Sequence, residues 1–217
     1  METLKGHWAG WLLVLASLLG GCANTGLMEE RDYARLDPPR PGAAADSPLI
    51  EVTEFIWFGC PHCADMHPHL QTWLRNKPAD VRLTYRPAVL TDAWAPGARL
   101  HHTLEALGEL ESRAGAVFEA VQLDDLDLAN EDAVLAWATR QGLDPGRFTA
   151  AYRSAEVQAR TSAAAQLTRD HQVRGVPTLV VDGKYLTSNR FTGSAPDTLK
   201  VLDRLIVKVR EEKQGRR

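Results

Sequence analysis

Apolar positions divide the region before residue 92 into a strand, a helix and a second strand. Residues 49–58 form a dense apolar and β-branched run, which is typical of a strand buried on both faces. Residues 60–75 predict a helix with a kink at Pro68, and residues 81–86 alternate between apolar and polar positions. A strand, a helix and a strand in this order form a right-handed parallel crossover. The pattern therefore predicts a fold of the α/β class.

The pattern becomes helical between residues 92 and 171. Apolar positions recur there at helical spacing and predict successive helices over 94–107, 110–123, 131–141, 145–152 and 154–171. Strands do not interrupt this run. We therefore interpret residues 92–171 as a helical subdomain inserted into the α/β fold.

Strands return after the insertion. Residues 174–185 predict a loop, a strand, a hairpin turn at Asp182-Gly183 and a second strand. Residues 199–209 place apolar side chains at helical spacing and predict a closing amphipathic helix. The α/β fold is thus expected to have a first part over 49–91 and a second part over 172–210.

Composition agrees with a single domain that contains an insertion, and it argues against one class of partner. The chain has 217 residues, of which 44% are hydrophobic, so it can bury a full core. Its net charge is −3 and its body has no basic cluster, which argues against nucleic acid as a partner. Residues 211–217, including Lys213, predict a polar, solvated tail.

The N-terminus has the pattern of an export signal. Lys5 and His7 precede an apolar run over residues 8–19, which is too short to span a bilayer comfortably. We therefore expect residues 1–21 to be a signal peptide. The next residues, Leu19-Gly20-Gly21-Cys22, resemble a bacterial lipobox, in which Cys22 would become the first mature residue and carry lipid. The alternative is an ordinary exported precursor with an unmodified Cys22.

Residues 22–48 predict a tether between this signal and the folded part. The segment is polar and contains several prolines and alanines. Within it, residues 33–36 alternate in the β manner and predict a short edge strand before the proline-rich turn.

The candidate chemistry lies directly after the first buried strand, in Cys60-Pro61-His62-Cys63. Two thiols at this spacing can close a small disulfide ring. Pro61 suits the first turn of a helix, which places Cys60 at the N-cap, where free amide groups and the helix dipole favour a thiolate. The stretch therefore predicts a redox-active pair.

An acidic residue interrupts the strand that leads to this pair. Glu54 lies six residues before Cys60 in an otherwise apolar run, where an unpaired charge is costly unless its pKa rises. One interpretation is an acid near the strand end that reaches solvent. The other is a proton acceptor for the deeper thiol, Cys63.

Two other uses of the cysteine pair have less support. A structural disulfide is disfavoured because a helix start raises thiol reactivity. A metal site could draw on Cys60, Cys63, His67 and His69, but residues two apart on a helix point to different faces, so we expect no metal. The remaining histidines are expected to be surface or helix residues rather than ligands: His101, His102 and His171.

The residues quoted above resemble one family. The run Glu54-Phe55-Ile56-Trp57-Phe58-Gly59-Cys60-Pro61-His62-Cys63 is similar to the strand and active site of DsbA-type proteins, and Gly175-Val176-Pro177-Thr178 resembles their cis-proline loop. The resemblance covers about residues 33–209. It implies a thioredoxin fold with an inserted helical subdomain.

The chain departs from the family pattern at a few positions. Many relatives carry an acid in the first helix where this chain has His67. Tyr85 and Arg86 stand near the place where some relatives have a lysine facing the buried acid. Trp94 could line a groove beside the active site, and a core position is equally compatible with the pattern. These departures concern tuning of the reduction potential rather than the type of reaction.

The resemblance implies a thiol:disulfide oxidoreductase that works through a mixed disulfide. Cys60 would be the exposed sulfur that client thiolates attack, and Cys63 the buried resolving partner. His62 would stabilise the Cys60 thiolate and set how strongly the disulfide is donated. Val176 and a cis Pro177 would pair with an extended client segment. No cofactor beyond the disulfide itself is expected.

The same resemblance implies the partners and the location. The clients would be reduced, newly exported proteins, and a DsbB-like membrane quinone reductase would reoxidise the pair. The protein would be a periplasmic monomer, anchored to a membrane through lipid on Cys22. The alternative within this fold is a disulfide reductase or isomerase, which would need a dimerisation domain for which this chain has no room.

Overall fold

A computed structural model describes residues 26–42 and 47–215. Within these residues the strands form a five-stranded sheet in the order β1-β5-β4-β2-β3. The strands are β1 (Ala34–Arg35), β2 (Ile50–Ile56), β3 (Val81–Pro87), β4 (Thr178–Val181) and β5 (Tyr185–Ser188). β2 pairs in parallel with β3, and all the other pairs are antiparallel. The predicted edge strand and the predicted hairpin are both confirmed.

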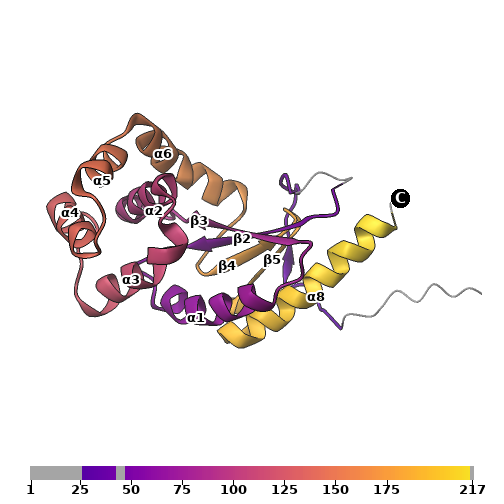
Figure 1. The fold of residues 1–217 in the computed structure, drawn as a ribbon. Coiled ribbons are helices and arrows are strands. Elements are labelled where there is room, and N and C mark those ends of the chain that lie inside the picture. Colours follow the sequence, from indigo (N-terminus) through magenta and orange to yellow (C-terminus); the bar gives the residue numbers. More distant parts are fainter. Residues whose placement is uncertain (1–25, 43–46, 216–217) are drawn as a thin grey trace, which may run out of the picture.

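The centre of the sheet is β2, whose two faces are covered by different elements. Ile50, Val52 and Ile56 face the larger core, which α1 (Pro61–Asn76) and α8 (Ala195–Gln214) complete. Figure 1 shows these two helices along the same side of the sheet. Phe55 faces the smaller cluster on the other side, which includes Leu36 and Val180. Burial on both faces explains the continuous apolar run in the sequence.

The helical subdomain is confirmed between β3 and β4. It consists of a short 3-10 turn η1 (Asp92–Trp94), α2 (Ala95–Leu107), α3 (Leu110–Leu123), α4 (Glu131–Arg140), α5 (Pro145–Tyr152) and α6 (Ala155–Asp170). Asn130, Asp144 and Ser154 cap three of these helices, because each side chain accepts a hydrogen bond from the backbone amide three residues on. The helices gather at one end of the sheet in Figure 1.

The C-terminal region differs from the sequence prediction in two ways. A short helix, α7 (Asn189–Thr192), follows β5 and was not predicted. The closing helix α8 runs from Ala195 to Gln214, so the prediction of a solvated tail over residues 211–217 is wrong for its first part. Lys213 is only 8% exposed. Its ammonium group donates to the Leu49 carbonyl oxygen at 2.8 Å and lies 3.2 Å from Asp182.

None of the described helices has both the length and the apolar character needed to cross a bilayer. The expected signal peptide and Cys22 lie outside the described residues.

Two histidines of α2 are buried rather than on the surface. His101 is completely buried and neither ring nitrogen has a hydrogen-bond partner. Burial, and then the neighbouring His102, lower the pKa of His101 to about 3. Glu105 lies close by, and its hydrogen bond with His102 is the largest cause that holds its pKa at about 2. His101 is therefore neutral in the folded protein at any physiological pH.

This burial makes the stability of the protein depend on pH. The unfolded chain binds a proton at His101 below about pH 6.5, whereas the folded chain does so only near a pKa of about 3. Stability is therefore complete above about pH 6.5 and is lost as the pH falls, by about 2 kcal/mol from this group at about pH 5. Urea unfolding at several pH values measures this loss.

His101→Leu should make the loss between neutral and mildly acidic pH clearly smaller, since the titrating group is removed. His69→Gln provides the matched control, because it removes a histidine from an exposed position and leaves the buried His101 in place. An identical pH dependence in His101→Leu and the parent protein would contradict this account.

Candidate active site

Cys60 stands at the N-terminus of α1, where β2 delivers the chain. Its backbone is extended, as an N-cap requires, and Pro61 occupies the first turn. Its amide donates to the Trp57 carbonyl oxygen at 3.0 Å, and its own carbonyl accepts from Cys63 and Ala64 at 3.0 and 3.1 Å. The predicted N-cap position of Cys60 is confirmed.

Both sulfurs are present as free thiols, and both are largely covered. Cys63 is 1% exposed and Cys60 is 9% exposed. The prediction of an exposed Cys60 therefore holds only relative to Cys63. Cys60 is therefore the more accessible of the two sulfurs to an incoming thiolate.

The surroundings of Cys60 favour its thiolate. Its pKa is lowered to about 6, and the largest cause is a hydrogen bond from the Cys63 thiol. The backbone amides of Cys63 and His62 lower it further, as does the charge of His62, while burial opposes the shift. The difference from a free thiol corresponds to about 4 kcal/mol in favour of the thiolate. His62 thus contributes less to this shift than the Cys63 thiol does.

Cys63 has the opposite character. Burial is the largest cause that raises its pKa well above the ordinary value, followed by its hydrogen bond to Cys60 and the charge there. One sulfur is therefore a thiolate at neutral pH while its neighbour keeps its proton. Such a pair differs in reactivity as well as in depth.

The loop before β4 lies against Cys60. The Val176–Pro177 peptide bond is cis, as the resemblance implied. The Cys60 sulfur lies 3.4 Å from the Val176 carbonyl oxygen, which its thiol form can use as a hydrogen-bond acceptor. Within the described part of the chain, the Val176 amide group has no hydrogen-bond partner. This amide is free to pair with an added strand.

A groove begins beside these residues and has a volume of about 960 Å³. His62 and Val176 line it near the sulfurs, and Leu186 and Phe191 line it farther along β5 and α7. Trp94 does not line this groove. Its indole instead stacks on Trp57, with ring centroids 4.2 Å apart and planes within 4°.

Sequence reasoning gave no role to Trp57, although it shapes the active-site turn. A Cβ atom at Gly59 would lie 2.4 Å from the Trp57 ring, which no real contact tolerates. Gly97 of α2 packs against the other edge of the same indole, where a Cβ atom would lie 3.2 Å away. The glycine directly before Cys60 was the available signal, because it permits this close approach.

Glu54 lies behind Cys63 on β2 and is 2% exposed. The interpretation that it reaches solvent is therefore wrong. Burial raises its pKa to about 8, and no hydrogen bond or ion pair of its side chain occurs within residues 26–42 and 47–215. Its register partners are Tyr85 on β3 and Leu179 on β4. At neutral pH the carboxyl group carries a proton.

Comparison with known proteins identifies the family. The model of the DSBA-like thioredoxin domain family matches residues 92–201. A thiol:disulfide interchange protein DsbA of Burkholderia cepacia is 33% identical over 183 residues, which cover 84% of this chain and 86% of the relative. The DsbA of Pseudomonas aeruginosa is 34% identical over 200 residues, or 92% and 94% of the two chains. The chain belongs to the DsbA family.

Solved structures agree with this assignment. The crystal structure of Pseudomonas aeruginosa DsbA has a TM-score of 0.81 and 32% identity, and the match covers 88% of this chain and 98% of that one. Reduced DsbA1 from Neisseria meningitidis has a TM-score of 0.75 and 29% identity, with 87% and 98% covered. The fold is thus a thioredoxin fold with a helical insertion, and the protein is a thiol:disulfide oxidoreductase.

Within the described residues of this DsbA-family chain, Cys60, Cys63, His67 and His69 do not form a group close enough to share an ion. His67 packs against Phe118, with ring centroids 5.5 Å apart, and His69 is exposed. Among the described residues, the group close enough to share an ion is His101, His102 and Glu105. Arg86 and Arg160 already contact that carboxylate, and their charges oppose a bound cation.

The structure also shows where Tyr85 and Arg86, two departures from the family pattern, lie relative to the buried Glu54. Tyr85, and not a cation, faces Glu54 across the β2–β3 pair. Arg86 is turned away and pairs with Glu105, at 3.4 Å. No positive charge therefore helps Glu54 to ionise, which leaves burial as the cause of its raised pKa.

The two thiols allow a direct test of what stabilises the Cys60 thiolate. Cys63→Ala removes the main hydrogen-bond donor and should raise the pKa of Cys60 by at least about one unit. Cys63→Ser keeps a donor in a similar place and should raise it much less. The ultraviolet absorbance of the thiolate, followed against pH, measures both values. Equal pKa values in the two variants would show that the donor has no part in the shift.

Proposed function

We propose that this oxidoreductase donates its Cys60–Cys63 disulfide to reduced, newly exported proteins. The observation that carries the proposal is the stabilised Cys60 thiolate at the start of α1, with its pKa near 6. Stabilising the reduced form of a dithiol makes the corresponding disulfide more oxidising. A pair with this character releases its disulfide readily to a client thiol.

The reaction follows from the positions of the two sulfurs. A client thiolate attacks Cys60, so a bond forms between the two sulfurs and the Cys60–Cys63 bond breaks. Cys63 leaves with the electron pair and takes up a proton, for which Glu54 is the nearest buried acid. A second client thiolate then attacks the client sulfur of the mixed disulfide and releases Cys60 as a thiolate. The client loses two electrons, and the enzyme gains them.

The loop at Val176 offers the means to hold the client. Its free amide and its carbonyl group can pair with an extended segment in the manner of an added strand. The carbonyl oxygen already lies within 3.4 Å of Cys60, so a paired segment would pass directly beside the reactive sulfur. Pro177 fixes the end of this loop, and the adjoining groove provides room for client side chains.

The cycle needs a partner that restores the disulfide. We propose a DsbB-like quinone reductase of the membrane, which would accept the electrons from Cys60 and Cys63. No other redox cofactor is required, because the two sulfurs carry both electrons. The protein would act as a monomer.

The location follows from the N-terminal sequence. An export signal over residues 1–21 would deliver the protein to the periplasm, an oxidising compartment. We propose that Cys22 then carries the lipid that anchors it to a membrane. The support is the run Leu19-Gly20-Gly21-Cys22. The prediction of a tether over residues 22–48 does not hold for residues 33–36, because the edge strand β1 pairs with β5 and Tyr33 and Leu36 are buried.

The proposed function is tested with a reduced client protein that has one pair of cysteines. The oxidised parent should convert this client to its disulfide form in equal amounts and become reduced itself, which mass spectrometry after thiol alkylation measures. Cys63→Ala should accumulate a mixed disulfide with a single-cysteine version of the client under oxidising conditions, because neither Cys63 nor a second client thiol is present to resolve it. Cys60→Ser, the matched control, should form none. A parent protein that leaves the client reduced would contradict the proposal.

A further inference from the structure

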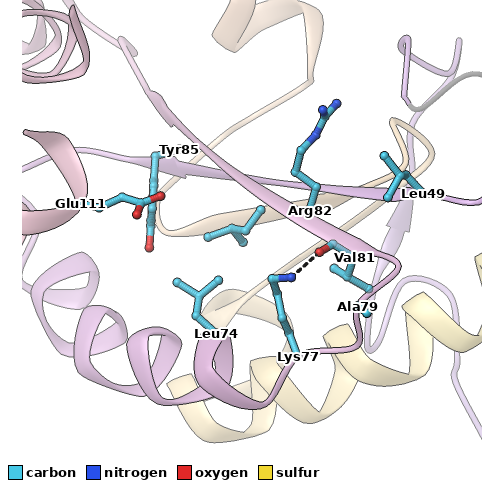
Figure 2. A pocket seen from close by; sticks show the side chains of 9 residues that line it. Leu49, Leu74, Lys77, Ala79, Val81, Arg82, Tyr85 and Glu111 are labelled. Atoms are coloured by element: carbon cyan, nitrogen blue, oxygen red, sulfur yellow. Dashed lines mark hydrogen bonds between the residues drawn. The ribbon is translucent and has the colours of Figure 1, made fainter. Parts of the chain in front are cut away.

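A pocket opens between α1 and β3 on the side of the sheet that carries Glu54. Its volume is about 330 Å³. Figure 2 shows Tyr85 extending from β3 toward α1 at one end, with the carboxylate of Glu111 beside its ring. Leu74 lies on the α1 side. The pocket is thus a solvent-facing hollow that ends at Tyr85.

Tyr85 also adjoins Glu54. The two residues are register partners on the parallel strands β2 and β3, so their side chains emerge side by side on the same face. The Tyr85 hydroxyl accepts a hydrogen bond from Gln71 of α1 at 3.1 Å, which fixes the ring against that helix. Tyr85 is 8% exposed and Glu54 is 2% exposed. The ring therefore stands between the buried acid and the pocket.

The charged groups around the pocket are already engaged, with one exception. Lys77 donates to the Val81 carbonyl oxygen at 2.6 Å, and Arg82 pairs with Glu51. Glu111 makes no ion pair within the described residues. It lies close enough to influence Tyr85 electrostatically, as Glu54 does from the other side.

On its inner side, Glu54 faces groups from three elements. Cys63 on α1 feels its charge, Tyr85 lies beside it on β3, and Leu179 on β4 is apolar. No cation is among these neighbours. Water that entered from the pocket would supply polar contacts able to stabilise an ionised carboxylate here.

The disulfide reaction requires that Glu54 keep its proton. This part of the inference rests on the proposed function. When a client thiolate attacks Cys60, Cys63 leaves as a thiolate in a site that is 1% exposed. A buried thiolate is unstable unless it gains a proton. Glu54 can supply that proton only if its carboxyl group has kept it.

We propose that Tyr85 is a positioning residue, whose ring closes the pocket and keeps water from Glu54, so that this acid retains the proton which the departing Cys63 sulfur takes up. Tyr85 thus acts through Glu54 and does not contact the client. The tyrosine ring, rather than its hydroxyl group, is the feature that matters. A smaller side chain at this position opens a path from the pocket to the carboxyl group.

Three substitutions at position 85 test the proposal. Tyr85→Val and Tyr85→Ala should lower the pKa of Glu54 by at least about one unit, because the carboxylate gains hydration. Tyr85→Phe keeps the ring and should leave this pKa within about half a unit of the parent value. Carbon NMR of glutamate-labelled reduced protein against pH measures it, and Glu54→Gln identifies the signal. Tyr85→Val retains a β-branched strand residue and serves if Tyr85→Ala does not fold.

Leu83→Ala is the matched control. Leu83 also lines the pocket, but it lies two residues before Tyr85 on β3 and pairs with Val52 rather than with Glu54. Leu83→Ala should therefore enlarge the pocket and leave the pKa of Glu54 unchanged. The pH profile for attack of a client thiolate on the oxidised protein provides a second readout. Its decline at high pH, where Glu54 loses the proton, should begin about one unit lower in Tyr85→Val.

Two kinds of result would overturn the proposal. One is an unchanged Glu54 pKa in both Tyr85→Val and Tyr85→Ala. The other is an equal shift in Leu83→Ala or in Tyr85→Phe, which would assign the effect to general loosening or to the hydroxyl group. The NMR titration uses no client. A parent protein that oxidises no client would therefore refute the proposed function while leaving the role of Tyr85 to be decided by the titration.

Discussion

The hydrogen bond from the Cys63 thiol to Cys60 is the interaction on which the rest of this site depends. It is the largest contribution that lowers the pKa of Cys60 to about 6. The two cysteines lie in the first turn of α1, with Cys60 at its N-cap and the Cys63 amide donating to the Cys60 carbonyl oxygen at 3.0 Å. The helix amides add to this effect. The thioredoxin fold thus holds the first turn of α1 next to the end of β2.

The two sulfurs differ in pKa because the fold places them in different surroundings. Cys60 meets amide groups, His62 and the Val176 carbonyl, whereas Cys63 points into the core toward Glu54. The same buried position that raises the pKa of Cys63 also raises that of Glu54. A proton exchanged between these two groups therefore need not pass through bulk water. The difference in depth between the two sulfurs creates the division between a nucleophile and a leaving group.

Much of this architecture could be predicted from the sequence, because local pattern and tertiary structure agree. The apolar run of β2, the helical spacing over 92–171 and the Asp182-Gly183 turn each determine their own element. The cysteine spacing and Pro61 located the active site in the same way. Glu54 was recognisable as well, since a carboxylate in a buried strand contradicts its surroundings.

The features that escaped prediction depend on contacts between distant segments. The stack of Trp57 on Trp94 joins the end of β2 to the inserted helices. The local sequence around either residue does not predict this contact. Lys213 is buried because its long side chain reaches the Leu49 carbonyl group and Asp182, which no local pattern encodes. The ranking of Cys63 above His62 likewise required the geometry of the first helical turn.

The most direct test of the account is the equilibrium between the Cys60–Cys63 pair and glutathione buffers, read out by alkylation and mass spectrometry. A thiolate stabilised at the start of α1 predicts a strongly oxidising disulfide, with a reduction potential above about −200 mV. A potential as low as about −270 mV, near that of thioredoxin, would contradict the claim that this site donates disulfides.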